Sequence, residues 1–178
     1  MLVTIGRRTV PEDLIGLLLE CHGRIRSFTH LAAELGTRQD LPAEEVVDAA
    51  ARVARYFREA LPLHVEDEEQ SLLPRLMGLD EELDAALATM HAQHEAHEPL
   101  LKELLQVLTA LQHAPQDGAV RERLAAVATS LRAELETHLK GEERVIFPQA
   151  QRHLGAEARE AVLSELRARR RRTLPGPT

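Results

Sequence analysis

Residues 83–111, LDAALATMHAQHEAHEPLLKELLQVLTAL, carry the repeat that decides the fold. Counting from Leu83, large side chains recur at alternating intervals of four and three residues as far as Leu111. This spacing places them along one face of a helix, as is typical of a helix that packs in a bundle. We expect one helix over about residues 80–111, bent at Pro99.

Three further segments show the same spacing of apolar residues. They predict helices over about residues 12–35, 42–74 and 120–148. Gly36 is expected to end the first of these helices, and Pro62 to kink or restart the second. Long helices with short connections pack against each other in antiparallel pairs. The sequence therefore predicts an all-α, up-down-up-down antiparallel four-helix bundle.

The C-terminal residues predict a short fifth helix over residues 157–172. It ends in arginines at positions 167 and 169–172. Terminal runs of one charge are usually solvated, so we expect this tail to be exposed. The chain then divides into a four-helix bundle, residues 1–155, and a C-terminal helical segment with an arginine-rich tail, residues 156–178.

The composition excludes several classes of protein. The 178 residues include no Trp, one Tyr and three Phe, which disfavours a β-sandwich and a surface that stacks nucleic-acid bases. The formal net charge of −7 also argues against nucleic acid as a partner. A single cysteine, Cys21, excludes an internal disulfide and a cysteine-based zinc or iron–sulfur site. With no long apolar stretch to predict a secretion signal or a membrane span, we expect a cytoplasmic protein.

One motif occurs twice, in the second and fourth predicted helices. Residues 61–74, LPLHVEDEEQSLLP, and residues 135–148, LETHLKGEERVIFP, both read L-x-x-H-x-x-x-E-E-x-x-[LI]-[LF]-P. The His and the first Glu of each copy are His64 and Glu68, and His138 and Glu142. In both helices they take positions where the apolar stripe should continue. Residues four apart share one helix face, so all four side chains should point into the bundle.

Carboxylates and imidazoles are costly to bury among apolar side chains unless a partner compensates them. Two isolated His–Glu hydrogen bonds are one alternative. A duplicated pair that faces one core instead indicates a shared cation. A shell of nitrogen and oxygen ligands with open positions favours iron over four-coordinate structural zinc. No His has a Glu three residues before it, which excludes the Glu-x-x-His pattern of ferritin-like oxidases.

The first and third helices supply the remaining candidate ligands. His22 lies beside the apolar stripe of the first helix. In the third helix, His94 and His97 replace core residues, whereas His91 falls to the flank. His94 precedes the His of the second motif copy by 44 residues, close to the 42 that separate His22 from the His of the first copy. This similarity favours His94, with His91 and His97 as alternative or outer ligands.

The second Glu of each motif copy, Glu69 or Glu143, lies about 100° round the helix from the first. We expect both side chains to face solvent. The alternative is that they hydrogen-bond the ligands or reach one metal at its edge.

The doubled motif, with a His in the first helix and another in the third, resembles the hemerythrin-like HHE cation-binding domain family over about residues 12–150. The resemblance implies a bundle that holds two non-haem iron ions joined by an oxo or hydroxo bridge. The implied ligands are His22 and His64 for one iron, His94 and His138 for the other, and Glu68 and Glu142 as bridges.

Oxygen-carrying hemerythrins have a second His one turn after the first on the third helix and an Asp on the fourth. Here Glu98 follows His94 at that spacing, and Glu142 replaces the Asp. The resemblance therefore implies a protein that binds or senses iron, oxygen or nitric oxide, with metal ions and a small diatomic ligand as partners. A di-iron enzyme of peroxidase or nitric-oxide-reductase type, and a structural bundle that docks on a partner, are the alternatives.

Overall fold

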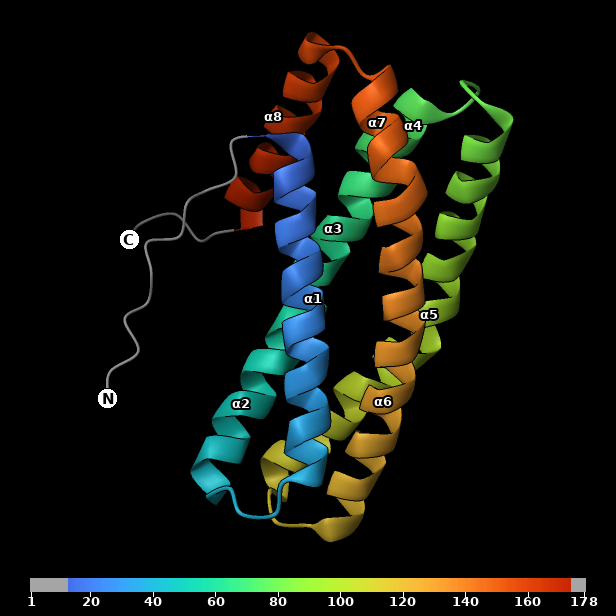
Figure 1. The fold of residues 1–178 in the computed structure, drawn as a ribbon. Helices are drawn as coiled ribbons and strands as arrows, with labels where there is room; N and C mark the ends of the chain where they lie inside the picture. The colour runs from blue at the N-terminus through green and yellow to red at the C-terminus, as the bar shows by residue number, and fades with distance from the viewer. Residues whose placement is uncertain (1–12, 174–178) are drawn as a thin grey trace.

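The computed structural model describes residues 13–173, which form helices joined by short turns (Figure 1). Helix α1 spans Leu14–Thr37. A continuous second rod, residues 43–76, consists of α2 (Ala43–Arg55), the π-helical turn η1 (Tyr56–Ala60), α3 (Leu61–Asp67), the π-helical turn η2 (Glu68–Leu72) and α4 (Leu73–Leu76). The remaining elements are α5 (Glu81–His113), α6 (Gly118–Gly141), the π-helical turn η3 (Glu142–Ile146), α7 (Phe147–His153) and α8 (Ala156–Thr173).

The four rods alternate in direction and enclose one core (Figure 1). Helix α1 packs against α2 and α6, and α5 packs against the same two helices from the other side. The predicted all-α, up-down-up-down four-helix bundle is therefore confirmed. Within residues 13–173, none of the helices is both long enough and apolar enough to span a membrane.

Buried polar residues divide the core into two apolar clusters. One cluster, which includes Leu35 and Leu124, fills the end of the bundle where α1 leads into α2. The other includes Leu14 and Phe147 and fills the opposite end. Between them every rod contributes buried His or Glu side chains, including His22 of α1. The polar residues that interrupt the apolar stripes in the sequence thus form one continuous layer across the bundle.

Three prolines, Pro62, Pro74 and Pro148, each follow a π-helical turn. The N–H of the residue before each proline donates to the carbonyl five residues back, from Leu61 to Tyr56, from Leu73 to Glu68 and from Phe147 to Glu142. Proline has no N–H, and its ring collides with the carbonyl four residues back, so a wider turn accommodates it. Pro62 therefore does not interrupt the second rod. In both motif copies the π turn begins at the buried Glu, Glu68 or Glu142.

The third rod accommodates its proline differently. Helix α5 continues through Pro99 with no π-helical turn. Its ribbon changes direction partway along its length, in agreement with the expected bend (Figure 1).

Gly36 does not end the first helix, contrary to the sequence prediction, because α1 continues to Thr37. Instead, Gly36 is the point of closest approach between α1 and α6. A Cβ atom at this position would lie 2.5 Å from the backbone nitrogen of Ala125 and 2.7 Å from its Cα. The residue is needed because the two backbones leave no space for a side chain.

Replacing Gly36 by Ala should lower the free energy of unfolding by about 2 kcal/mol, because the added methyl group would push α1 away from α6. Gly23 of the same helix is the matched control, since nothing lies within 4 Å of a Cβ placed there. Gly23→Ala should raise stability by about 0.5–1 kcal/mol, because alanine favours a helix interior. Urea unfolding of the metal-free protein measures both. Equal effects of the two substitutions would contradict the close approach.

The C-terminal helix α8 packs on the bundle. Its Val162 and Leu166 belong to the same apolar cluster as Leu14. Two residues of the arginine run, Arg169 and Arg170, pair with a buried carboxylate of the second rod. The expectation that the whole run is solvated is therefore wrong, because burying that carboxylate requires cations beside it. The domain boundary at residue 155 stays a prediction, and residues 1–12 and 174–178 lie outside the described part.

Candidate metal centre

The polar layer at the middle of the bundle brings together the six residues that the sequence predicted as ligands. Their ligand atoms fall into two groups within which all atoms lie less than 4.8 Å apart. One group consists of His22, His64, Glu68 and Glu142, and the other of Glu68, His94, His138 and Glu142. Both carboxylates are thus shared, and each pair of histidines belongs to one group only.

Each shared carboxylate offers one oxygen to each group. Oε1 of Glu68 lies 3.1 Å from His64 Nε2, and its Oε2 lies 3.3 Å from His94 Nε2. Oε2 of Glu142 lies 3.1 Å from His22 Nε2, and its Oε1 lies 3.1 Å from His138 Nε2. Every histidine therefore presents its Nε2, and each Glu has the arrangement of a bridging ligand.

These short contacts are not hydrogen bonds. The four oxygens of Glu68 and Glu142, and the Nε2 atoms of His22, His64 and His94, are buried without a hydrogen-bond partner. Each of these atoms instead lies within 4.8 Å of the other ligand atoms of its group. Two ligands at right angles, each about 2.1 Å from one metal ion, lie about 3.0 Å apart. The donor set and its spacing fit a pair of divalent cations.

A second layer of side chains holds three of the four histidines by Nδ1. Glu143 Oε1 lies 2.8 Å from His22 Nδ1, and Glu69 Oε1 lies 2.9 Å from His94 Nδ1. The expectation that Glu69 and Glu143 face solvent is therefore wrong, because the neighbouring helices bring an imidazole to each. Hydrogen bonds of this kind fix the tautomer and leave Nε2 free to bind a cation.

The third such partner is Gln93, whose Oε1 lies 2.9 Å from His138 Nδ1. Gln93 is not among the residues predicted from the sequence. Gln93 directly precedes His94 and lies about 100° from it round the helix, so its place beside the buried face was the available signal.

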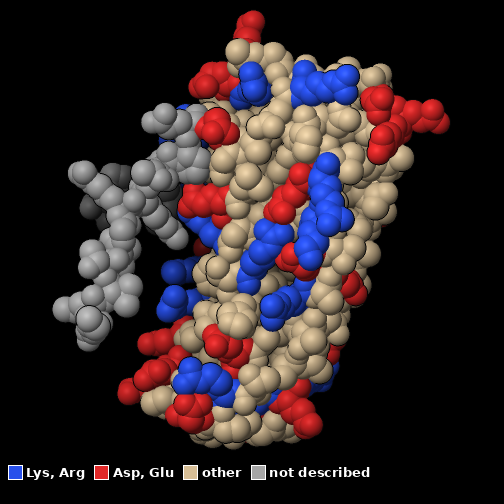
Figure 2. Space-filling view, in the orientation of Figure 1, with Lys and Arg blue, Asp and Glu red and all other residues tan. Residues whose placement is uncertain are grey.

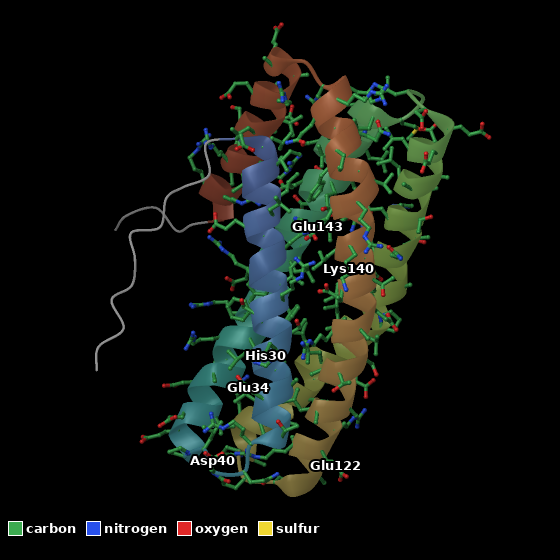
Figure 3. The ribbon with its side chains drawn as sticks, in the orientation of Figure 1. His30, Glu34, Asp40, Glu122, Lys140 and Glu143 are labelled. Carbon is green, nitrogen blue, oxygen red and sulfur yellow. The ribbon has the colours of Figure 1, made fainter. Side chains whose placement is uncertain are left out.

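Glu143 also contacts charged side chains on the surface between α1 and α6. Arg26 of α1 donates to Glu143 and to Glu136, each at 2.8 Å, and Lys140 lies 3.3 Å from Glu136. Acidic and basic side chains alternate on this face in Figure 2, and Figure 3 labels Glu143 and Lys140 on the same side of the molecule. His30 is exposed on α1 beside Glu34 (Figure 3). A chain of charged groups thus connects His22 to solvent.

The two alternative histidines of α5 lie outside both groups of ligand atoms. His91 is exposed and hydrogen-bonds Glu69 at 2.9 Å. His97 is buried, and its ring packs edge-on against that of His138 at 5.2 Å. Burial lowers the pKa of His97 to about 4, which keeps the imidazole neutral. The helix register therefore places His94 nearest the shared carboxylates, as the sequence analysis favoured.

In the metal-free centre, the pKa values of the histidines show that the buried carboxylates require positive charge beside them. Burial alone would lower the pKa of His22, but the carboxylates of Glu142 and Glu68 outweigh it and raise this pKa to about 10. Glu68 likewise outweighs burial at His94, whose pKa rises to about 9. His64 is fully buried, and its pKa is lowered. Without metal, two imidazolium groups therefore supply positive charge that a cation would otherwise provide.

These shifts predict opposite pH dependences for the metal-free and metal-loaded proteins. A histidine stabilises the fold when its pKa in the folded protein lies above its unfolded value of about 6.5. This stabilisation is complete below pH ~6.5 and disappears as the pH rises through the pKa of the folded protein. The metal-free protein should therefore lose about 2–4 kcal/mol of stability between pH 7 and pH 10. The metal-loaded protein should instead lose stability on acidification below pH ~6.5, because protons displace the cation from imidazole.

Urea unfolding at several pH values, in chelator and in excess metal, measures both dependences. His22→Gln should flatten the alkaline loss in the metal-free protein, whereas the exposed His30→Gln should leave it unchanged. A metal-free protein that gains stability between pH 7 and pH 10 would contradict the charge state inferred for His22 and His94.

A cavity of about 30 Å³ adjoins the second group of ligands. It is lined by His64, His94, His97 and His138 and by the apolar residues Ile25, Leu61, Val65, Leu101 and Leu135. Its volume is about that of one water molecule. The arrangement therefore leaves room for one small ligand next to the centre and excludes larger molecules.

Comparison with known proteins agrees with this geometry. Residues 13–150 and residues 90–174 both match the family model described as Hemerythrin HHE cation binding domain. A search of curated proteins found no match. The first matched range contains both motif copies and all six converging residues, and it covers most of the chain. The chain belongs to the hemerythrin HHE cation-binding domain family.

Proposed function

We propose that this protein binds two iron ions and uses them to take up or sense a small diatomic molecule, oxygen or nitric oxide. The proposal depends above all on the two carboxylates, each of which offers one oxygen to each histidine pair. His22 and His64 would hold one iron, His94 and His138 the other, and Glu68 and Glu142 would bridge them. Iron bound in this way would supply redox chemistry and affinity for diatomic ligands.

Iron is proposed over zinc because of the ligand count. Each group supplies two nitrogens and two oxygens, which leaves one or two positions of a five- or six-coordinate ion for a small molecule. The cavity of about 30 Å³ lies beside the His94–His138 group, where such a molecule would bind. Its apolar residues, such as Leu101 and Leu135, exclude bulk water, and the neutral His97 is a polar group that faces the ligand.

The same cavity has no space for a larger substrate, so the chemistry proposed for the centre is limited to small molecules. An anaerobic titration of the metal-free protein with ferrous iron tests the proposal. We expect binding to saturate at about two ions per chain, followed by a change in the optical spectrum when oxygen or nitric oxide is added. One ion or fewer per chain, or retention of zinc against excess iron, would contradict the di-iron site. Sustained turnover of peroxide or nitric oxide would instead indicate an enzyme.

A further inference from the structure

A second and larger cavity, of about 290 Å³, lies beside the metal centre. Residues of α1, of the second rod and of α8 line it, including Arg24, Tyr56, Glu59, His64 and Arg170. Its volume suits a ligand of a few non-hydrogen atoms. His64 lines both this cavity and the 30 Å³ cavity, so its ring lies between the metal centre and the larger space.

His64 differs from the other three histidines of the centre. Their Nδ1 atoms each have a side-chain oxygen within 2.9 Å, supplied by Glu143, Glu69 and Gln93. The Nδ1 of His64 is buried and has no hydrogen-bond partner. Its Nε2 faces Glu68, so Nδ1 carries the proton when Nε2 binds a cation. A buried donor left without an acceptor costs about 1–3 kcal/mol, so this position needs an acceptor from elsewhere.

The other polar groups of the cavity are mainly donors. Arg24 and Arg170 contribute guanidinium groups, and among the described residues the Tyr56 hydroxyl has no hydrogen-bond partner. Arg24 pairs with Glu20 through one of its terminal nitrogens. A guanidinium has five N–H donors, so others are available to a ligand. Cys21 contacts Arg170 at 3.4 Å, and burial raises its pKa, so the thiol is neutral and does not compete as an anion. Glu59 is the one acidic residue in the lining.

We propose that this cavity binds a small oxyanion, a short carboxylate or inorganic phosphate, whose oxygen accepts the proton of His64 Nδ1. The guanidinium of Arg24 and the hydroxyl of Tyr56 bind the remaining oxygens. An acceptor at Nδ1 makes Nε2 a better metal ligand, so the anion and the cation strengthen each other's binding by the same factor. The inference uses the proposed role of His64 as a ligand, but it does not depend on which metal is bound.

The test is a titration of the full-length protein with acetate and, separately, with phosphate, in metal-free and zinc-loaded forms. The ¹⁵N resonances of labelled histidines report the anion, and His64→Gln assigns the signal of His64 Nδ1. We expect saturable binding that shifts this resonance, with tighter binding in the zinc-loaded form. A response to acetate alone, to phosphate alone or to both identifies the preferred oxyanion.

Variants locate the anion in the cavity. Arg24→Gln should weaken binding at least about fivefold and Tyr56→Phe about threefold, whereas the exposed Arg123→Gln should leave it unchanged. Tyr56→Phe keeps the ring that stacks on Phe28, so the fold is preserved. No saturable response of His64, or equal affinity in Arg24→Gln and the parent protein, would overturn the inference. Because zinc replaces iron here, failure of the iron titration leaves this result interpretable.

Discussion

Replacing Glu68 by Ala should remove both metal ions at once, lowering the bound metal from about two ions per chain to nearly none. The reason is that its two oxygens contact different histidines, His64 and His94, so one substitution takes a ligand from each group. Glu142→Ala should have the same effect, because its oxygens contact His22 and His138. Metal analysis after reconstitution with excess ferrous iron and desalting measures the loss.

The single-group variants are the essential comparison. His22→Ala and His94→Ala should each weaken the binding of one ion and leave the other partly bound, since each imidazole belongs to one group. His91→Ala should leave the content near two, because His91 lies outside both groups and its ring nitrogens lie near Glu69 and Glu95. If His91→Ala removes as much metal as Glu68→Ala while His94→Ala has no effect, the ligand assigned to α5 is wrong.

Replacing Asp67 by Ala should destabilise the metal-free protein by about 3 kcal/mol. The Asp67 side chain is fully buried, and its oxygens lie 2.9 Å from Arg169 and 2.7 Å from Arg170 of α8. Burial raises the pKa of Asp67 despite these two cations, so the ion pair itself adds little net stability. Removing one partner is costly nevertheless, because the buried guanidinium of Arg169 would lose its ion pair with Asp67, which is shorter than its pair with Glu66.

Glu66 provides the matched control for this prediction. It precedes Asp67 and lies 4.0 Å from Arg169, but its side chain is 46% exposed. Glu66→Ala should therefore change the free energy of unfolding by less than about 0.5 kcal/mol. Urea unfolding compares the two variants, and amide hydrogen exchange should show faster exchange in α8 of Asp67→Ala. Equal stabilities would mean that the apolar contacts of α8 alone attach it to the bundle.

The bundle and the inner residues of the centre can be predicted from the pattern of residues along each helix. A helix repeats every 3.6 residues, so the four-three spacing from Leu83 to Leu111 specifies a helix and its buried face. The same periodicity shows which polar residues replace apolar ones, and the duplicated H-x-x-x-E identifies two of them in each copy. These inferences need only positions along one helix, which the sequence contains.

Which side chains meet across helices depends on the tertiary structure. Glu69 and Glu143 lie off the apolar stripe, and their contacts with His94 and His22 depend on how α5 and α1 rotate against the motif helices. The approach of Gly36 to Ala125 depends on the distance between two backbones. Neither quantity follows from periodicity.

The arginines of α8 illustrate the same limit. A run of one charge has no helical period that distinguishes a buried arginine from a solvated one, so the sequence predicted an exposed tail. Asp67 is buried where α8 packs, and it takes Arg169 and Arg170 as partners. Whether a charge is buried depends on the opposite charge that the fold brings beside it, and here that partner lies about a hundred residues away in the sequence.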